Sequence, residues 1–207
     1  DVNGDGLEDV AIGAPDGACA VSTADGGACG NAYVFMAPFA ATLSAGDADL
    51  VLQGTELGSE FGHSLANAHD WNDDGSTDIL IGAPGHSTDN GRVYVVDPTD
   101  TSGDIDSTSM AILEGESGRL GAAVQGVGDA DDDGFNDAIV GAPDYDTSVS
   151  ATGAAFIYWG TGGTGTFSPG SSMKSNGANG EFGSSLQYTS VLTDSTVFDF
   201  VVGSPAA

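Results

Sequence analysis

Positive charge is scarce in this 207-residue chain, which has three lysine and arginine side chains against 31 aspartates and glutamates. The formal charge of −28 disfavours binding to nucleic acid or to an anionic membrane surface. The sequence also lacks an apolar run approaching the roughly 18 residues that a membrane-spanning helix needs. These shortages predict no nucleic-acid partner and no direct membrane insertion.

Cysteine is equally scarce, since only Cys19 and Cys29 occur and they lie ten positions apart. A zinc site would need further ligands nearby, and the sequence offers none. We therefore favour a disulfide that closes a small surface loop, worth about 2 to 3 kcal/mol. Such a bond indicates an oxidising, extracellular compartment, whereas two free thiols remain the alternative.

Runs of helix-forming residues are missing as well, while glycine is abundant, with 33 residues. This composition is typical of short strands joined by many turns. The chain begins with Asp1 rather than methionine, and it begins inside a motif. We expect it to be a piece of a larger protein, so the missing signal peptide says nothing about secretion.

A repeated motif organises the sequence. DVAIGAP (9–15) recurs as DILIGAP (78–84), DAIVGAP (137–143) and DFVVGSP (199–205), and related segments upstream are EFGHSL (60–65), RLGAAV (119–124) and EFGSSL (181–186). Apolar, β-branched segments follow at 31–38, 91–98 and 153–160, with weaker ones at 49–54 and 109–115. About four strands in about 63 residues predict a propeller blade.

The predicted units have definite boundaries. Residues 55–115 and 116–177 form complete blades, 1–54 supply three strands of an earlier blade, and 178–207 supply two strands of a later one. The predicted fold class is therefore an all-β, incomplete β-propeller of about 3 to 3.5 blades. Such a piece cannot close a ring, and its open edges would favour association.

Phe-Gly followed by Gly-Ala-Pro, with an aspartate-rich loop between them, resembles the FG-GAP repeat of integrin α-subunit propellers and their bacterial relatives. The resemblance covers essentially the whole chain, in two complete and two partial copies. It implies a seven-bladed propeller, of which this chain would supply roughly half. It also implies calcium in the hairpin loops of one face, where the ion stiffens the blades, and partner binding on the opposite face.

Three aspartate-rich loops fit the pattern D-x-[DN]-x-D-G-x-x-D. Positions 1, 3, 5 and 9 offer side-chain oxygens and position 7 offers a backbone carbonyl, which suits Ca²⁺ with its preference for six to eight oxygens. The candidate ligands are Asp1, Asn3, Asp5, Leu7 and Asp9; Asp70, Asn72, Asp74, Ser76 and Asp78; and Asp129, Asp131, Asp133, Phe135 and Asp137. About three structural ions would follow, and Glu8, Asp73 and Asp132 would point to solvent.

Two other kinds of loop share part of this pattern. An EF-hand or dockerin loop needs an acid at position 12, where this chain has Ile12, Ile81 and Val140. A plain solvated turn is the other, because Asp and Gly are ordinary turn residues, but three copies at one offset argue against it. The fourth copy has Val191, Thr193 and Ser195 at ligand positions, so we expect no metal there.

Several motifs resemble catalytic or ligand-binding motifs but lack residues that those motifs need. GHSLA (62–66) resembles a nucleophile elbow, but Ala123 replaces its serine in another copy, and GTGGTGT (160–166) lacks the lysine of a phosphate loop and predicts an inter-strand turn. The three histidines share no spacing. Trp71, Tyr158 and Trp159 could form a sugar platform, although packing between blades is the favoured interpretation.

The function these features favour is a calcium-binding, non-catalytic module for extracellular adhesion or recognition. Its partner would be a protein or glycan met by the variable loops after each Gly-Ala-Pro, the longest of which holds residues 18–30. We expect a secreted or cell-surface protein. Alternatives are an accessory propeller of a secreted, phospholipase-like hydrolase and a sugar-binding lectin propeller.

Overall fold

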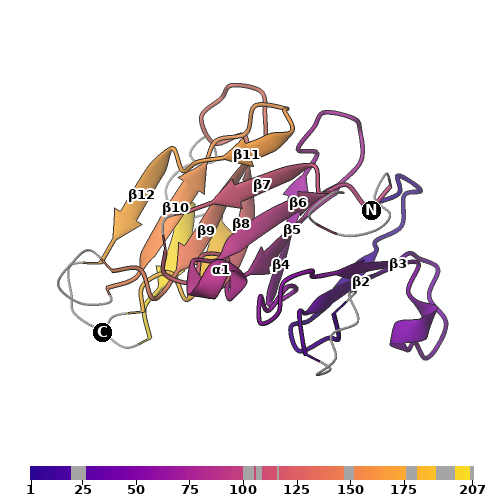
Figure 1. Ribbon diagram of the computed structural model, residues 1–207. Coiled ribbons are helices and arrows are strands. Elements are labelled where there is room, and N and C mark those ends of the chain that lie inside the picture. Colours follow the sequence, from indigo (N-terminus) through magenta and orange to yellow (C-terminus); the bar gives the residue numbers. More distant parts are fainter. Residues whose placement is uncertain are drawn as a thin grey trace.

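The computed structural model describes residues 1–19, 27–99, 105, 109–115, 117–146, 152–175, 181–189 and 199–205. Within these ranges the protein is built almost entirely of short strands in four small sheets, which follow one another across the molecule (Figure 1). The helical elements are η1 (Ala45–Asp47) and α1 (His86–Asp89). No helix of the described ranges has the length and apolar character needed to cross a bilayer. The predicted all-β class is confirmed.

The strands occur in the order that the repeat predicts. The first sheet has the order β1-β2-β3, with β1 (Val10–Ala14), β2 (Asn31–Phe35) and β3 (Leu50–Gln53). The second has the order β11-β7-β6-β5-β4, with β4 (Ser64–His69), β5 (Asp78–Ala83), β6 (Arg92–Val96), β7 (Ala111–Glu114) and β11 (Gly165–Phe167). The third has the order β12-β10-β9-β8, with β8 (Ala123–Gly128), β9 (Asp137–Ala142), β10 (Ala154–Tyr158) and β12 (Ser171–Lys174), and the fourth pairs β13 (Ser185–Thr189) with β14 (Asp199–Gly203).

The two-strand unit of the repeat is an antiparallel hairpin with a constant register. Ser64 pairs with Gly82, Ala123 with Gly141, and Ser185 with Gly203. The first two hairpins also share a bulge just before the aspartate loop, between Asn67 and His69 and between Gly126 and Gly128. The constant register explains the fixed spacing between the upstream motif and Gly-Ala-Pro.

One strand differs from the expectation. The end of the predicted turn at 160–166 belongs to β11, which pairs in parallel with β7 of the second sheet. The attachment has two physical causes: β7 would otherwise present an open edge, and Phe167 finds an aromatic partner in the loop between β4 and β5. The Phe167 ring lies edge-on to Trp71, with centroids 5.7 Å apart. The segment 116–177 therefore contributes a strand to the preceding sheet.

The core lies between successive sheets. Every residue of β5 and of β9 is buried, because each strand is flanked by two others and covered by neighbouring sheets. Strand β1 corresponds to them in the repeat but is half exposed, since among the described residues it pairs with β2 alone. Its side chains Val10 and Ile12 are 43% and 51% exposed.

The Phe-Gly and Gly-Ala-Pro motifs meet where the sheets touch. The N–H of Gly62 donates to the carbonyl of Gly82 in its own sheet, at 3.0 Å. The carbonyl of Gly62 lies directly over Gly13 of the preceding sheet, so that a Cβ on Gly13 would overlap it. Gly121 stands in the same relation to Gly141 and Gly82. The signature glycines therefore set the distance between adjacent sheets.

Candidate metal centre

The three aspartate loops have the same internal hydrogen bonds. In each, the first aspartate accepts two backbone N–H groups, from positions 5 and 6 of the loop. These bonds are 2.8–3.0 Å long for Asp1, Asp70 and Asp129. Backbone N–H groups of the loop thus fix both oxygens of the first carboxylate.

The middle of each loop is also constant. The position-5 aspartate accepts the N–H of position 7, at 2.8 Å for Leu7 and Ser76 and 2.9 Å for Phe135. The glycine at position 6 has φ between 86° and 97° in all three loops, a left-handed conformation that glycine adopts without steric cost. The loops therefore fold alike although their position-7 side chains differ.

The aspartate at position 9 begins β5 in the second loop and β9 in the third, and it directly precedes β1 in the first. Its Oδ2 accepts the N–H of position 2, at 2.8 Å from Val2 to Asp9 and 2.7 Å in the other two loops. Asp78 and Asp137 are fully buried, whereas Asp9 is only partly buried. Burial therefore places two carboxylates where negative charge is costly.

Burial has the expected effect on these two acids. It raises the pKa of Asp78 to about 7, and the negative charges of Asp97, Asp74 and Asp70 add to the rise. It raises the pKa of Asp137 to about 6, with Asp131 and Asp133 adding to the rise. In both cases backbone N–H groups act in the opposite direction. Such a set of acids is suited to binding a cation, because positive charge offsets their desolvation and mutual repulsion.

The third loop brings its acids closest together. Asp129, Asp131 and Asp137 each offer a carboxylate oxygen, and these atoms lie within 4.8 Å of one another. Asp133 is outside this group. All-oxygen donors of this kind fit a hard cation such as Ca²⁺.

The first two loops have an amide at position 3. The Oδ1 atoms of Asn3 and Asn72 accept the N–H of position 5, and their Nδ2 atoms donate to the carboxylates of Asp5 and Asp74. The amide thus joins positions 3 and 5, the same pair that the metal hypothesis makes neighbours. Glu8, Asp73 and Asp132 are exposed, as predicted, and the fourth copy of the loop (191–198) lies outside the described residues.

Two residues of this region were not expected from the sequence. Asp97 follows β6 and is buried, and its side chain interacts electrostatically with those of Asp74 and Asp78. Asn136 donates from Nδ2 to the backbone carbonyl of Asp70, which ties the third loop to the second. An acid directly after an apolar strand was the one available signal for Asp97, and Asn136 had none.

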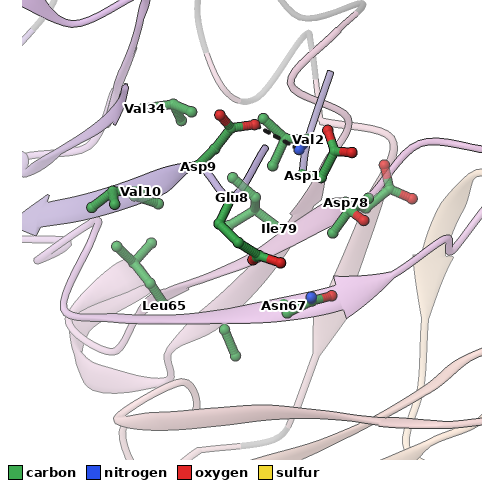
Figure 2. A pocket seen from close by; sticks show the side chains of 13 residues that line it. Asp1, Val2, Glu8, Asp9, Val10, Val34, Leu65, Asn67, Asp78 and Ile79 are labelled. Carbon is green, nitrogen blue, oxygen red and sulfur yellow. Dashed lines mark hydrogen bonds between the residues drawn. The ribbon is translucent and has the colours of Figure 1, made fainter. Parts of the chain in front are cut away.

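A cavity of about 240 Å³ adjoins the first two loops. Figure 2 shows the side chains of Asp1, Glu8 and Asp9 from the first loop, and those of Asp78 and Asn67 from the second sheet, around it. Apolar side chains of β1 and β4 complete its walls. The first loop therefore lies beside the second sheet at the level where Asp78 begins β5.

The cysteines, Ser64 and two of the aromatic residues singled out in the sequence have structural roles. Cys19 and Cys29 form the predicted disulfide. Ser64 lies on strand β4 and donates to the carbonyl of Gly121, a contact between sheets rather than a nucleophile elbow. Trp71 and Tyr158 are fully buried, as packing between blades predicts, so neither belongs to an exposed sugar platform.

Fold and loops together define a class: an all-β repeat protein of small stacked sheets, whose hairpins carry matching acidic loops. Comparison with known proteins agrees. The FG-GAP repeat family model matches residues 61–96. Integrin alpha-5 of Xenopus laevis is 34% identical over 172 residues, which are 76% of this chain and 15% of that protein.

Two further relatives are informative. Integrin alpha-PS2 of Drosophila melanogaster is 33% identical over 171 residues, covering 78% of this chain and 11% of that protein. Phosphatidylinositol-glycan-specific phospholipase D of Mus musculus is 37% identical over 102 residues, covering 44% of this chain and 12% of that protein. The chain therefore contains an FG-GAP repeat and is homologous to integrin alpha chains over most of its length, and it spans less than a sixth of these relatives.

Proposed function

We propose that this chain is a calcium-binding, non-catalytic segment of a β-propeller that serves extracellular recognition of a protein partner. The observation that carries the proposal is the third loop, where the carboxylates of Asp129, Asp131 and Asp137 converge and Asp137 is buried. The same backbone hydrogen bonds recur in the other two loops. Three sites are thus proposed, with the ligand positions predicted from the sequence.

A bound calcium ion supplies positive charge to each loop and performs no chemistry. The residues of the chain do the rest. The position-1 and position-9 aspartates hold the two ends of the loop together through backbone N–H groups. Because position 9 is also the first residue of β5 and β9, neutralising its charge stabilises the buried start of the strand.

We propose that the sheets, apart from β11, are the blades predicted for residues 1–54, 55–115, 116–177 and 178–207, with the partner bound by loops that follow Gly-Ala-Pro. Residues 20–26 of the longest such loop lie outside the described ranges. Within its described part, Cys29 is fully buried and its carbonyl accepts the N–H of Phe61. A test of partner binding should therefore replace residues 20–26 and keep the disulfide and residues 27–30.

A second candidate function rests on the mouse phospholipase D. Its 102 matched residues make an accessory propeller of a secreted hydrolase the alternative to an adhesion module. A metal-rich helical domain in the flanking sequence would favour the hydrolase, whereas further adhesive or sandwich domains would favour adhesion. A glycan array on the complete propeller would separate a lectin from either.

Calorimetric titration of the full 207-residue chain with Ca²⁺ tests the proposal. We expect about three sites and a melting temperature that falls in chelator, because ligand at 100 times its Kd stabilises the native state by about 2.7 kcal/mol per site. Asp137→Asn should remove one site. The matched control, Asp132→Asn, removes the same charge from an exposed position in the same loop and should retain all sites. A folded chain that takes up no calcium at millimolar concentration would contradict the proposal.

A further inference from the structure

Asp97 lies at the end of β6, beside the second aspartate loop. Its side chain is buried, and Oδ1 accepts both the N–H and the hydroxyl of Thr99 at 2.7 Å. Val96 pairs with Ile79, so the residues next to this pair, Asp97 and Asp78, lie at neighbouring strand ends, and Asp97 is the foremost of the negative charges acting on Asp78. A buried acid thus lies beside the acids of the second loop, an arrangement that costs free energy unless a cation joins them.

The position-9 aspartates reveal what is different about the second loop. Oδ1 of Asp9 accepts the N–H of Ala37, and Oδ1 of Asp137 accepts the N–H of Gly160, both at 2.8 Å. Val10, the residue after Asp9, pairs with Phe35, and Ala37 lies two residues beyond Phe35. In the same way Ala138, the residue after Asp137, pairs with Tyr158, and Gly160 lies two residues beyond Tyr158. In the second sheet Ile79 pairs with Val96, so the corresponding residue is Pro98, which has no N–H.

The consequence is an orphaned oxygen. The Asp78 side chain is fully buried, and its Oδ1 atom has no hydrogen-bond partner among the described residues. A buried acceptor left without a donor is destabilising, and native structures satisfy nearly all such groups. Where the other two loops place an N–H, the second loop places a proline and, one residue before it, the carboxylate of Asp97.

The number of carboxylates points the same way. The third loop has four acids at side-chain ligand positions, because Asp131 occupies position 3, whereas the second has Asn72 there and only three. Asp97 restores the fourth. The first loop has Asn3 at position 3 and Met36 at the place of Asp97, so it stays at three.

We propose that Asp97 supplies the fourth carboxylate of the cation site formed by residues 70–78, with the free oxygen of Asp78 turned toward the same ion. The second site is thereby matched to the third, and both bind Ca²⁺ more tightly than the first, since the number of charged ligands tunes calcium affinity. This inference rests on the proposed calcium function and adds to it a ligand outside the repeated motif.

The test compares Asp97→Asn with Asp73→Asn in calcium titrations of the full chain. Asparagine at 97 keeps an oxygen for Thr99, so the turn after β6 is preserved. Asp73 is exposed and has φ 60°, which asparagine tolerates, so its replacement removes the same charge without strain. Asp97→Asn should weaken one site by about 10- to 100-fold and leave the others unchanged, whereas Asp73→Asn should change affinity by less than about threefold.

Two further measurements separate a ligand from a merely structural residue. In chelator, Asp97→Asn should melt at the same temperature as the parent or higher, because it removes repulsion among buried acids, whereas in calcium it should melt lower. Adding Asn72→Asp to Asp97→Asn places the fourth acid where the third loop has Asp131, and it should restore the lost affinity. A variant that melts lower in both conditions would assign Asp97 a structural role and overturn the inference.

The outcomes distinguish this inference from the proposed function. Uptake of about three ions, with no site weakened in Asp97→Asn, would overturn the role of Asp97 and leave the calcium loops standing. Absence of calcium uptake by the folded parent chain would overturn both. One site weakened selectively, and rescued by Asn72→Asp, would establish Asp97 as part of the second site.

Discussion

At the scale of single residues, the signature glycines act by close approach between sheets. The carbonyl of Gly121 lies over Gly82 as that of Gly183 lies over Gly141. No side chain fits between them, because even a Cβ on Gly82 would overlap that oxygen and the hydroxyl of Ser64. The motif is repeated because the turn before each sheet packs directly against the backbone of the preceding sheet.

Gly82→Ala tests this packing. The added methyl group must push apart the second and third sheets, so we expect the free energy of unfolding to fall by about 1–3 kcal/mol, as for other overpacked cores. Urea unfolding in saturating calcium measures it. Gly46→Ala is the matched control, since its Cβ would meet nothing nearer than the Ser44 hydroxyl at 3.8 Å. Equal stability of the two variants would contradict the argument.

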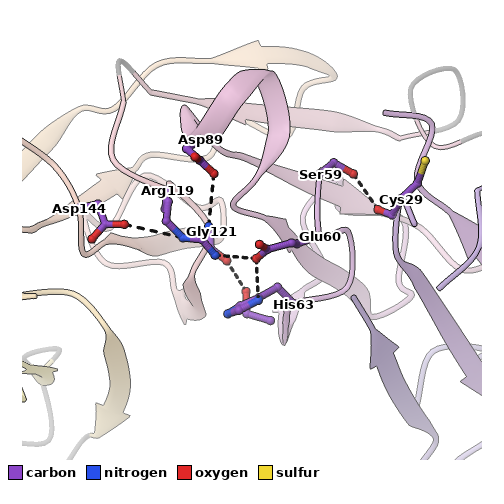
Figure 3. A network of polar contacts seen from close by, with 9 residues as sticks. Cys29, Ser59, Glu60, His63, Asp89, Arg119, Gly121 and Asp144 are labelled. Atoms are coloured by element: carbon purple, nitrogen blue, oxygen red, sulfur yellow. Dashed lines mark hydrogen bonds and ion pairs between the residues drawn. The ribbon is translucent and has the colours of Figure 1, made fainter. Parts of the chain in front are cut away.

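At the scale of elements, Arg119 joins three connecting segments (Figure 3). Its guanidinium pairs with Glu60 at 2.6 Å, Asp89 at 3.3 Å and Asp144 at 3.8 Å. These acids belong to the turn before β4, to α1 and to the turn after β9. The hydrogen bond to Glu60 is the main cause that raises the pKa of Arg119. One cation thus serves acids from the second and third repeats.

Replacing Arg119 should loosen this junction. Arg119→Ala should lower the free energy of unfolding by about 1 kcal/mol at low salt, because exposed acids limit the strength of each pair. Arg119→Lys should be intermediate, since an ammonium cannot match the several donors of a guanidinium. Both keep a non-glycine residue at φ 60°, so the backbone cost cancels. Loss of the difference between Ala and Lys would show that packing, not charge, is the cause.

What the sequence could reveal at this scale depended on repetition. Asp78 and Asp137 begin β5 and β9 as the aligned copies predict, because a hairpin of fixed loop length has one possible register. Strand β11 was missed because it is three residues long and pairs with a strand of another repeat. Asp97 was missed for the same physical reason: it approaches the second loop from a different strand, and no local pattern encodes such a contact.

At the scale of the whole molecule, like charge dominates the surface. The chain has 31 acids against three lysine and arginine side chains, so negative charge is in large excess. Three bound calcium ions would change the formal charge from −28 to −22, since each carries two positive charges. Self-repulsion of this size destabilises the compact state and is reduced by salt.

Salt should therefore stabilise this protein, although it weakens individual ion pairs. Raising sodium chloride from 0.01 to 1 M shortens the Debye length from about 30 to about 3 Å. The loss is confined to a few pairs worth at most about 1 kcal/mol each, such as Arg92 with Glu114, whereas the gain extends over all the acids. In chelator we expect the melting temperature to rise by about 5 °C or more, measured by calorimetry. With calcium bound the rise should be smaller, because the loops are already neutralised. A melting temperature that falls with salt would mean that the ion pairs around Arg119 and Arg92 outweigh the repulsion among the acids.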